Sequence, residues 1–113
     1  MEEILQLLSD SDIVREYEIL NVLQDEDFYY LKIKSSIIDD CILYIKLYLS
    51  ETEYNYAFHL QKNNGEFIAR WDNAPHHKEI HTHPHHKHSS HGITESYSIT
   101  LDDILREIKV LLK

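Results

Sequence analysis

The chain has 113 residues, of which 42% are hydrophobic and 27% are charged. This length and composition suit one small globular domain over residues 1–113, and they exclude a second independent core, a wholly disordered chain and a disulfide scaffold. The formal net charge is −9, from 20 acidic and 11 basic residues, which argues against a broad surface for nucleic acid.

Cysteine content and the first residues indicate the compartment. Cys41 is a single thiol and cannot close a bridge within the chain, as is usual in a reducing cytosol. The chain starts with the acidic pair Glu2 and Glu3, where a signal peptide would be basic, and it contains no apolar run of roughly 18 residues. We therefore expect a cytoplasmic protein without a membrane partner.

The first predicted elements are a short helix and three strands. Residues 2–8 carry apolar residues at helical spacing and run into a Ser and Asp cluster that favours a turn. Alternation then predicts strands over 14–23, 28–37 and 41–49. The last of these has a strict period of two, and its second face, with tyrosines and a lysine, suits a half-covered surface.

A hairpin and a second helix follow. The segments 54–60 and 66–71 flank Asn63-Asn64-Gly65, and Asn-Gly is a strong hairpin signal because both residues tolerate positive φ. Thr100 and Asp103 form a capping box before a helix that extends to Lys113. We predict an α+β fold in which an antiparallel sheet of about five strands carries an N-terminal and a C-terminal helix.

Eight of the nine histidines and both prolines lie between residues 70 and 91. Almost no apolar residue follows Trp71 there, so the sequence predicts a histidine-rich loop over 72–92 whose composition core formation does not explain. The fixed charges of this stretch, three basic and two acidic, make it a weakly basic island in an acidic chain. The histidines are interspersed with other residues, unlike a purification tag.

Imidazole chemistry favours acid–base catalysis in this segment. An ordinary pKa of about 6.5 lets neighbouring rings serve as general base and general acid near neutral pH. Cleavage of RNA needs both, and Arg70 or Lys87 would stabilise charge on the phosphoryl oxygens without any metal. Asp72 would either cap a turn or orient a catalytic ring through Nδ1.

Three other interpretations stay open. Neutral imidazoles bind zinc, copper or nickel, and adventitious binding is expected at His81, His83 and His85. Collective protonation would make the segment a pH sensor, and a solvated loop without chemistry is the simplest alternative.

Two strings resemble a known family. Arg-Trp-Asp-Asn-Ala-Pro-His-His, residues 70–77, and Pro-His-His-Lys-His, residues 84–88, occur in order before the last helix and resemble the TumE-like toxins of type II toxin–antitoxin systems. The resemblance implies a toxin that attacks RNA and an antitoxin partner with a DNA-binding domain. The matching positions are Arg70, Asp72, His76, His77, His85, His86, Lys87 and His88; His81, His83 and His91 go beyond the pattern.

The leading hypothesis is therefore a cytoplasmic endoribonuclease toxin that needs no cofactor. Its acid–base pair would combine His76 or His77 with one of His85, His86 and His88, while Arg70 and Lys87 bind phosphate and Asp72 orients a ring. The alternatives are a metal-binding or metal-sensing module with zinc, and a metal-dependent nucleotidyl- or phosphoryl-transfer toxin. A homodimer and a hetero-oligomer with the antitoxin are both compatible with the sequence.

Overall fold

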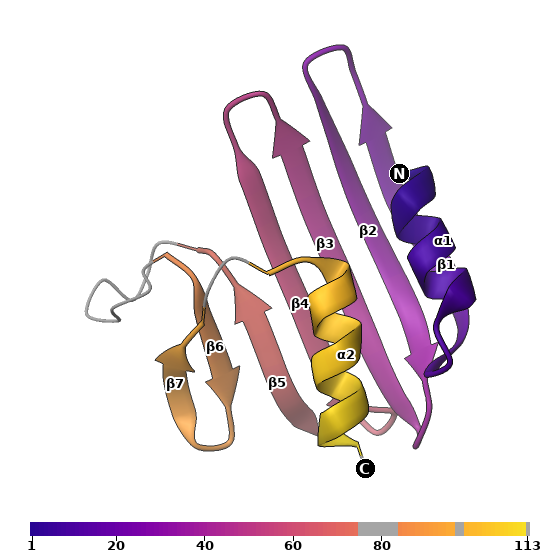
Figure 1. Cartoon of the computed structure of the whole chain (residues 1–113), viewed down its shortest axis with the longest axis vertical. Coiled ribbons are helices and arrows are strands. Elements are labelled where there is room, and N and C mark those ends of the chain that lie inside the picture. Colours follow the sequence, from indigo (N-terminus) through magenta and orange to yellow (C-terminus); the bar gives the residue numbers. More distant parts are fainter. Residues whose placement is uncertain (75–83, 97–98, 113) are drawn as a thin grey trace.

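The computed structural model describes residues 1–74, 84–96 and 99–112. In chain order its elements are α1 (Glu2–Asp10), β1 (Val14–Gln24), β2 (Phe28–Ile37), β3 (Cys41–Ser50), β4 (Tyr54–Lys62), β5 (Phe67–Asp72), β6 (His86–Ser89), β7 (Gly92–Glu95) and α2 (Leu101–Leu111). The strands form one antiparallel sheet in which each strand pairs with the next along the chain (Figure 1). None of the described helices is long and apolar enough to span a bilayer.

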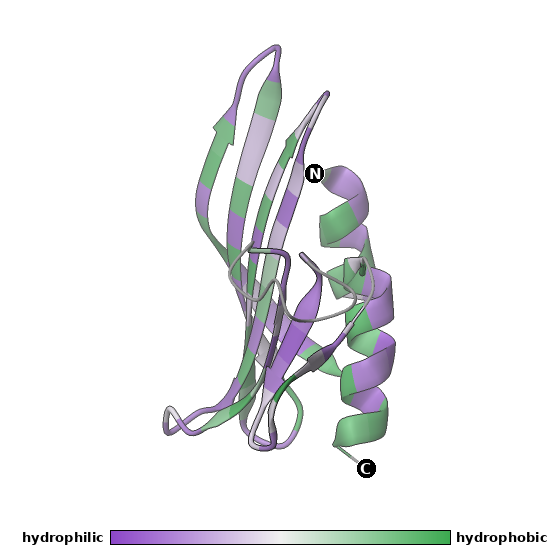
Figure 2. Ribbon diagram, turned by 90° about the vertical axis from the view of Figure 1, so that its left-hand side faces the viewer, coloured by the Kyte–Doolittle hydropathy of each residue, from purple (hydrophilic) through white to green (hydrophobic). Residues whose placement is uncertain are grey.

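Both helices lie on the same face of the sheet, as the side view in Figure 2 shows. The core lies under them because alternate strand residues point to one face. Ile33, Ile45, Phe58 and Trp71 are paired in register on four neighbouring strands, and all four are fully buried. The opposite side, which we call the open face, consists of the intervening residues of β2 to β6 and carries no described helix.

The predicted helices and the hairpin signal are confirmed. Leu8 is the buried residue of α1 and packs into the core. On α2 the buried stripe consists of Leu101, Ile104, Leu105 and Ile108. Thr100 and Asp103 form the expected capping box, in which each backbone N–H donates to the side chain of the other residue. Gly65, in the turn between β4 and β5, has a φ of 95°, a value that glycine adopts without strain.

The predicted number of strands was wrong, because the sheet has seven strands and not about five. The expected loop over 72–92 contains β6 and the start of β7. The sequence of β6, His-Lys-His-Ser, has no apolar alternation, and every residue of β7 is exposed, so hydrophobic periodicity carries no signal for either strand. Their backbones pair with β5 and with each other.

Candidate functional site

A row of paired residues crosses the open face from β2 to β6. In order, the register aligns Lys32, Lys46, Ala57, Asp72 and His86. Paired residues on neighbouring strands have their side chains on the same face of the sheet. The two lysines, the small side chain of Ala57, the Asp72 carboxylate and the His86 imidazole therefore lie in one row on the open face. The adjacent row continues through Arg70 on β5 to His88 on β6.

The carboxylate of Asp72 is the centre of the site and is only 4% exposed. Its Oδ1 accepts a hydrogen bond from the backbone N–H of Ala74 at 3.0 Å and lies 2.9 Å from Nε2 of His86. Its Oδ2 accepts from Nε of Arg70 at 3.0 Å and lies 3.5 Å from Nε2 of His88. A buried carboxylate is stable only when it is paired and hydrogen-bonded, and these four groups provide both.

His86 is held on both sides of its ring and is 2% exposed. Its Nε2 faces Asp72, and its Nδ1 lies 2.8 Å from the carbonyl oxygen of Pro84. Both ring nitrogens of His86 therefore lie within hydrogen-bonding distance of an oxygen acceptor. His86 is therefore placed to fix the carboxylate, and the histidine–aspartate contact uses Nε2 and not the expected Nδ1.

His88 and Arg70 flank the carboxylate nearer to solvent. The side chain of His88 is 28% exposed and its ring meets that of His86 edge-on, with centroids 4.7 Å apart. The Arg70 side chain is 40% exposed although its Nε is bonded to Asp72. A guanidinium anchored in this way has limited freedom and is suited to binding a phosphoryl oxygen.

His85 lies on the helix side of β6. Its ring stacks on Tyr56, with centroids 5.8 Å apart and 12° between the planes, and its Nδ1 is 2.8 Å from the Tyr56 hydroxyl. Burial raises the pKa of Tyr56, with smaller contributions from Tyr54 and Asp72, so the phenol is protonated at neutral pH. The fold thus separates His85 from the pair formed by His86 and His88.

Lys87 also points to the helix side, because residues alternate along a strand. Its Nζ lies 2.8 Å from Oε1 of Glu107 on α2 and 5.1 Å from the centroid of the Trp71 ring. These contacts tie the β6–β7 hairpin to the C-terminal helix. Of the two cations predicted to bind phosphate, the open face therefore carries Arg70, and Lys87 is paired on the other side.

Of the remaining histidines, four lie outside the described residues and two, His59 and His91, lie within them. The four outside are His76, His77, His81 and His83. The structure therefore places one member of the predicted acid–base pair, from His85, His86 and His88, but not the other, His76 or His77. His91 is exposed in the turn between β6 and β7. His59 lies on β4 opposite Arg70, and its pKa is lowered by burial and then by the charge of Arg70.

Three of the grouped side chains are also suited to a metal ion. One ligand atom from each of Asp72, His86 and His88 lies within 4.8 Å of the other two. Two imidazoles and a carboxylate are a common set for catalytic zinc, and the carbonyl of Pro84 bonded to Nδ1 of His86 is the usual support for such a ligand. His85, expected as an adventitious ligand, lies on the helix side.

Sequence reasoning missed the contribution of the earlier strands. Lys32, Lys46 and Ala57 join the site only through the register of the sheet. The available signal was the half-covered face of β3, where Lys46 lies between Tyr44 and Tyr48.

Comparison with known proteins identifies the family. Residues 4–112 match the family described as Toxin TumE. No curated protein and no solved structure matches the chain. The matched range covers nearly the whole chain and includes Asp72 and the three side chains gathered at its carboxylate, so the chain belongs to the TumE toxin family.

Proposed function

We propose that the chain is the toxin of a toxin–antitoxin pair and that it cleaves RNA at the open face. One observation carries this proposal: Asp72 gathers Arg70, His86 and His88 around one carboxylate, at the end of a row of lysines. Exchangeable protons and a fixed cation are the groups that phosphodiester cleavage requires.

The chemistry assigns a role to each group. As general base, His88 removes the proton of a ribose 2′-OH, and the 2′-oxygen attacks the adjacent phosphorus. The bond from phosphorus to the 5′-oxygen breaks, and a second histidine, His76 or His77, protonates the departing oxygen. Arg70 stabilises the charge on the phosphoryl oxygens, and Asp72 with His86 positions His88 and Arg70. The products are a 2′,3′-cyclic phosphate and a 5′-OH.

A metal-dependent nucleotidyl- or phosphoryl-transfer toxin is the second candidate. The observation that favours it is the cluster of ligand atoms on Asp72, His86 and His88. A divalent cation bound there would act as a Lewis acid on a phosphoryl oxygen. Chelation separates the two candidates, because the acid–base route needs no metal.

The test is cleavage of a transcript by the purified chain, with His88→Ala beside His91→Ala. The two residues belong to one hairpin, but His91 is exposed in the turn and does not contact Asp72 in the described structure. We expect cleavage by the parent chain in EDTA, a loss of at least about 100-fold in His88→Ala, and no change in His91→Ala. Equal rates in the two variants would contradict the role of His88, and activity that EDTA abolishes and zinc restores would favour the second candidate.

Membership in a toxin family implies an antitoxin partner. We propose that the antitoxin carries a DNA-binding domain and covers the histidine segment in a cytoplasmic complex. Protection of the imidazoles from diethylpyrocarbonate on co-expression with the product of the adjacent gene would support this, and unchanged labelling would contradict it.

A further inference from the structure

We propose that the substrate binds as single-stranded RNA laid across the open face, perpendicular to the strands, from Arg70 over Lys46 towards Lys32. This inference rests on the proposed function, because it gives the Asp72 site its substrate path. It assigns a binding role to β2, β3 and β4, which contribute no group to the proposed catalysis.

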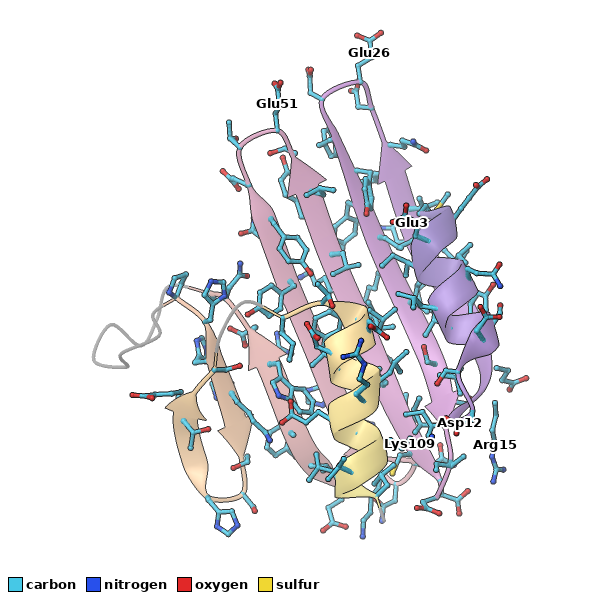
Figure 3. All side chains as sticks on the ribbon, in the orientation of Figure 1. Glu3, Asp12, Arg15, Glu26, Glu51 and Lys109 are labelled. Atoms are coloured by element: carbon cyan, nitrogen blue, oxygen red, sulfur yellow. The ribbon has the colours of Figure 1, made fainter. Side chains whose placement is uncertain are left out.

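The first support is the segregation of charge in an acidic chain. Among the described residues of β2 to β6, the cations on the open face are Lys32, Lys34, Lys46 and Arg70, and the one carboxylate is the buried Asp72. The other acidic residues that the structure describes lie on the helices, on β1 and β7 and in the turns, and Glu18 of β1 is paired opposite Lys34 at the edge of this surface. Figure 3 shows Glu26 and Glu51 at hairpin tips and Glu3 on α1. A net charge of −9 thus coexists with a local basic surface that attracts phosphates.

The second support is the relief of the open face. One hollow of about 370 Å³ lies beside Asp72, and a second of about 380 Å³ lies beside His59. Both are lined by Lys46, Ala57 and Arg70, so they meet at the small side chain of Ala57. Neighbouring β-strands are about 4.8 Å apart. An RNA chain lying in the two hollows would therefore pass Lys46 on β3 and reach the Asp72 carboxylate on β5, two β-strands away.

The third support is a set of aromatic rings beside the cations. Tyr30 and Tyr48 line the first hollow, and Tyr44 lines the second. Phe28 stacks on Tyr48 with ring centroids 5.6 Å apart, which orients the Tyr48 ring. Half-exposed rings interleaved with cations provide stacking surfaces for unpaired bases, whereas a duplex keeps its base faces stacked inside the helix.

The binding experiment uses the full chain and an RNA oligonucleotide with 2′-O-methyl groups, so that no 2′-OH is available for cleavage. Fluorescence anisotropy measures the Kd of this oligonucleotide as a single strand and as a perfect duplex. The variants are Lys46→Met, which removes a cation; Ala57→Leu, which fills the meeting point of the hollows; and Tyr48→Leu, which removes a ring. Lys109→Met, on α2 across the sheet, is the matched control, because it removes a lysine that pairs with Asp12 away from the open face.

We expect each open-face variant to weaken single-strand binding by about tenfold and Lys109→Met to leave it unchanged. Lys46→Met should also reduce the slope of log K against log salt by about 0.7, as expected for one lost phosphate contact on a single strand. Circular dichroism controls for folding, and Lys46→Met, at an exposed position, keeps the test valid if Ala57→Leu fails to fold.

The proposal is overturned if Lys46→Met and Tyr48→Leu bind the single strand as tightly as the parent chain, if the duplex binds more tightly, or if an acidic peptide displaces the RNA at equal charge concentration. The outcome is separable from that of the proposed function. If the 2′-O-methyl RNA binds tightly and the variants weaken its binding, but unmodified RNA is not cleaved, the binding surface would be supported and the cleavage would be refuted. Cleavage with binding that no variant changes would refute the surface alone.

Discussion

Arg70 faces titratable groups from two directions, with Asp72 two residues along its strand and His59 opposite on β4. Burial lowers the pKa of His59, the Arg70 charge lowers it further, and the hydrogen bond to Gln61 partly offsets both. The pKa of His59 in the folded chain is therefore below its ordinary value of 6.5.

Replacing Arg70 by methionine tests this electrostatic link. The substitution removes a positive charge, which favours the protonated form of the opposite ring, so the pKa of His59 should rise towards 6.5. NMR titration of the imidazole measures the shift. Arg15→Met serves as the control, because Arg15 lies on β1 and not among the groups that shift His59. A fall, or no change, in the pKa with Arg70→Met would show that Arg70 does not act on this ring.

His86 and His88 have different predicted roles although both contact Asp72. His86→Ala leaves a buried carboxylate without the side chain that lies closest to it, at 2.9 Å, and should reduce the free energy of unfolding by about 3 kcal/mol. His88→Ala removes a partly exposed ring at 3.5 Å from the carboxylate and should cost less than about 1 kcal/mol. Urea denaturation measures both values, and equal losses would contradict the division into a positioning and a reacting histidine.

At the scale of elements, the capping box of α2 gives a prediction with a defined pH dependence. The backbone N–H of Thr100 is the largest cause that lowers the pKa of Asp103, followed by the Thr100 side chain. A carboxyl with a lowered pKa in the folded state stabilises the fold above its unfolded pKa, about 3.9, and this contribution is lost as the pH falls below that value.

Asp103→Asn should therefore be less stable than the parent chain at pH 7, by about 0.5 to 1 kcal/mol, and the difference should shrink between pH 4 and pH 2. Thermal unfolding at a series of pH values measures the difference. Asp102→Asn is a suitable control, because Asp102 pairs with Arg106 and takes no part in the box. A difference that stays constant with pH would contradict the assigned hydrogen bonds.

The contact between β6 and α2 gives a second prediction at this scale. Lys87→Met keeps most of the aliphatic stem on Trp71 but breaks the ion pair with Glu107. We expect a loss of stability of at most about 1 kcal/mol and an unchanged Kd for the 2′-O-methyl single strand. A loss of binding like that of Lys46→Met would return Lys87 to the phosphate-binding role expected from the sequence.

Most elements were predictable because their signal is local. Strict alternation identified β3, the Asn-Gly turn identified the hairpin of β4 and β5, and the capping box identified the start of α2. β6 was missed because the interactions of its side chains are tertiary, His86 with Asp72 and Lys87 with Glu107, and β7 was missed because all of its residues are exposed. Histidine and lysine at alternate positions do not read as a hydrophobic period.

The same distinction applies to the site. Composition was enough to point to the histidine segment, and the family strings pointed to Arg70 and Asp72. Which face each residue occupies depends on the register of β6, which separates Lys87 from Arg70 and His85 from His86. The contribution of Lys32 and Lys46 depends on strands that lie far away in sequence and close in the sheet.

At the scale of the whole molecule, we propose that the open face of the sheet binds RNA and exchanges protons with it, while the helices cover the other face. The most direct measurement is mass spectrometry of the RNA ends after incubation of a transcript with the purified chain in EDTA. We expect fragments that end in 2′,3′-cyclic phosphate and begin with 5′-OH, and we expect these fragments to be absent with His88→Ala. Intact RNA, or fragments that carry 3′-OH and 5′-phosphate ends, would contradict this proposal.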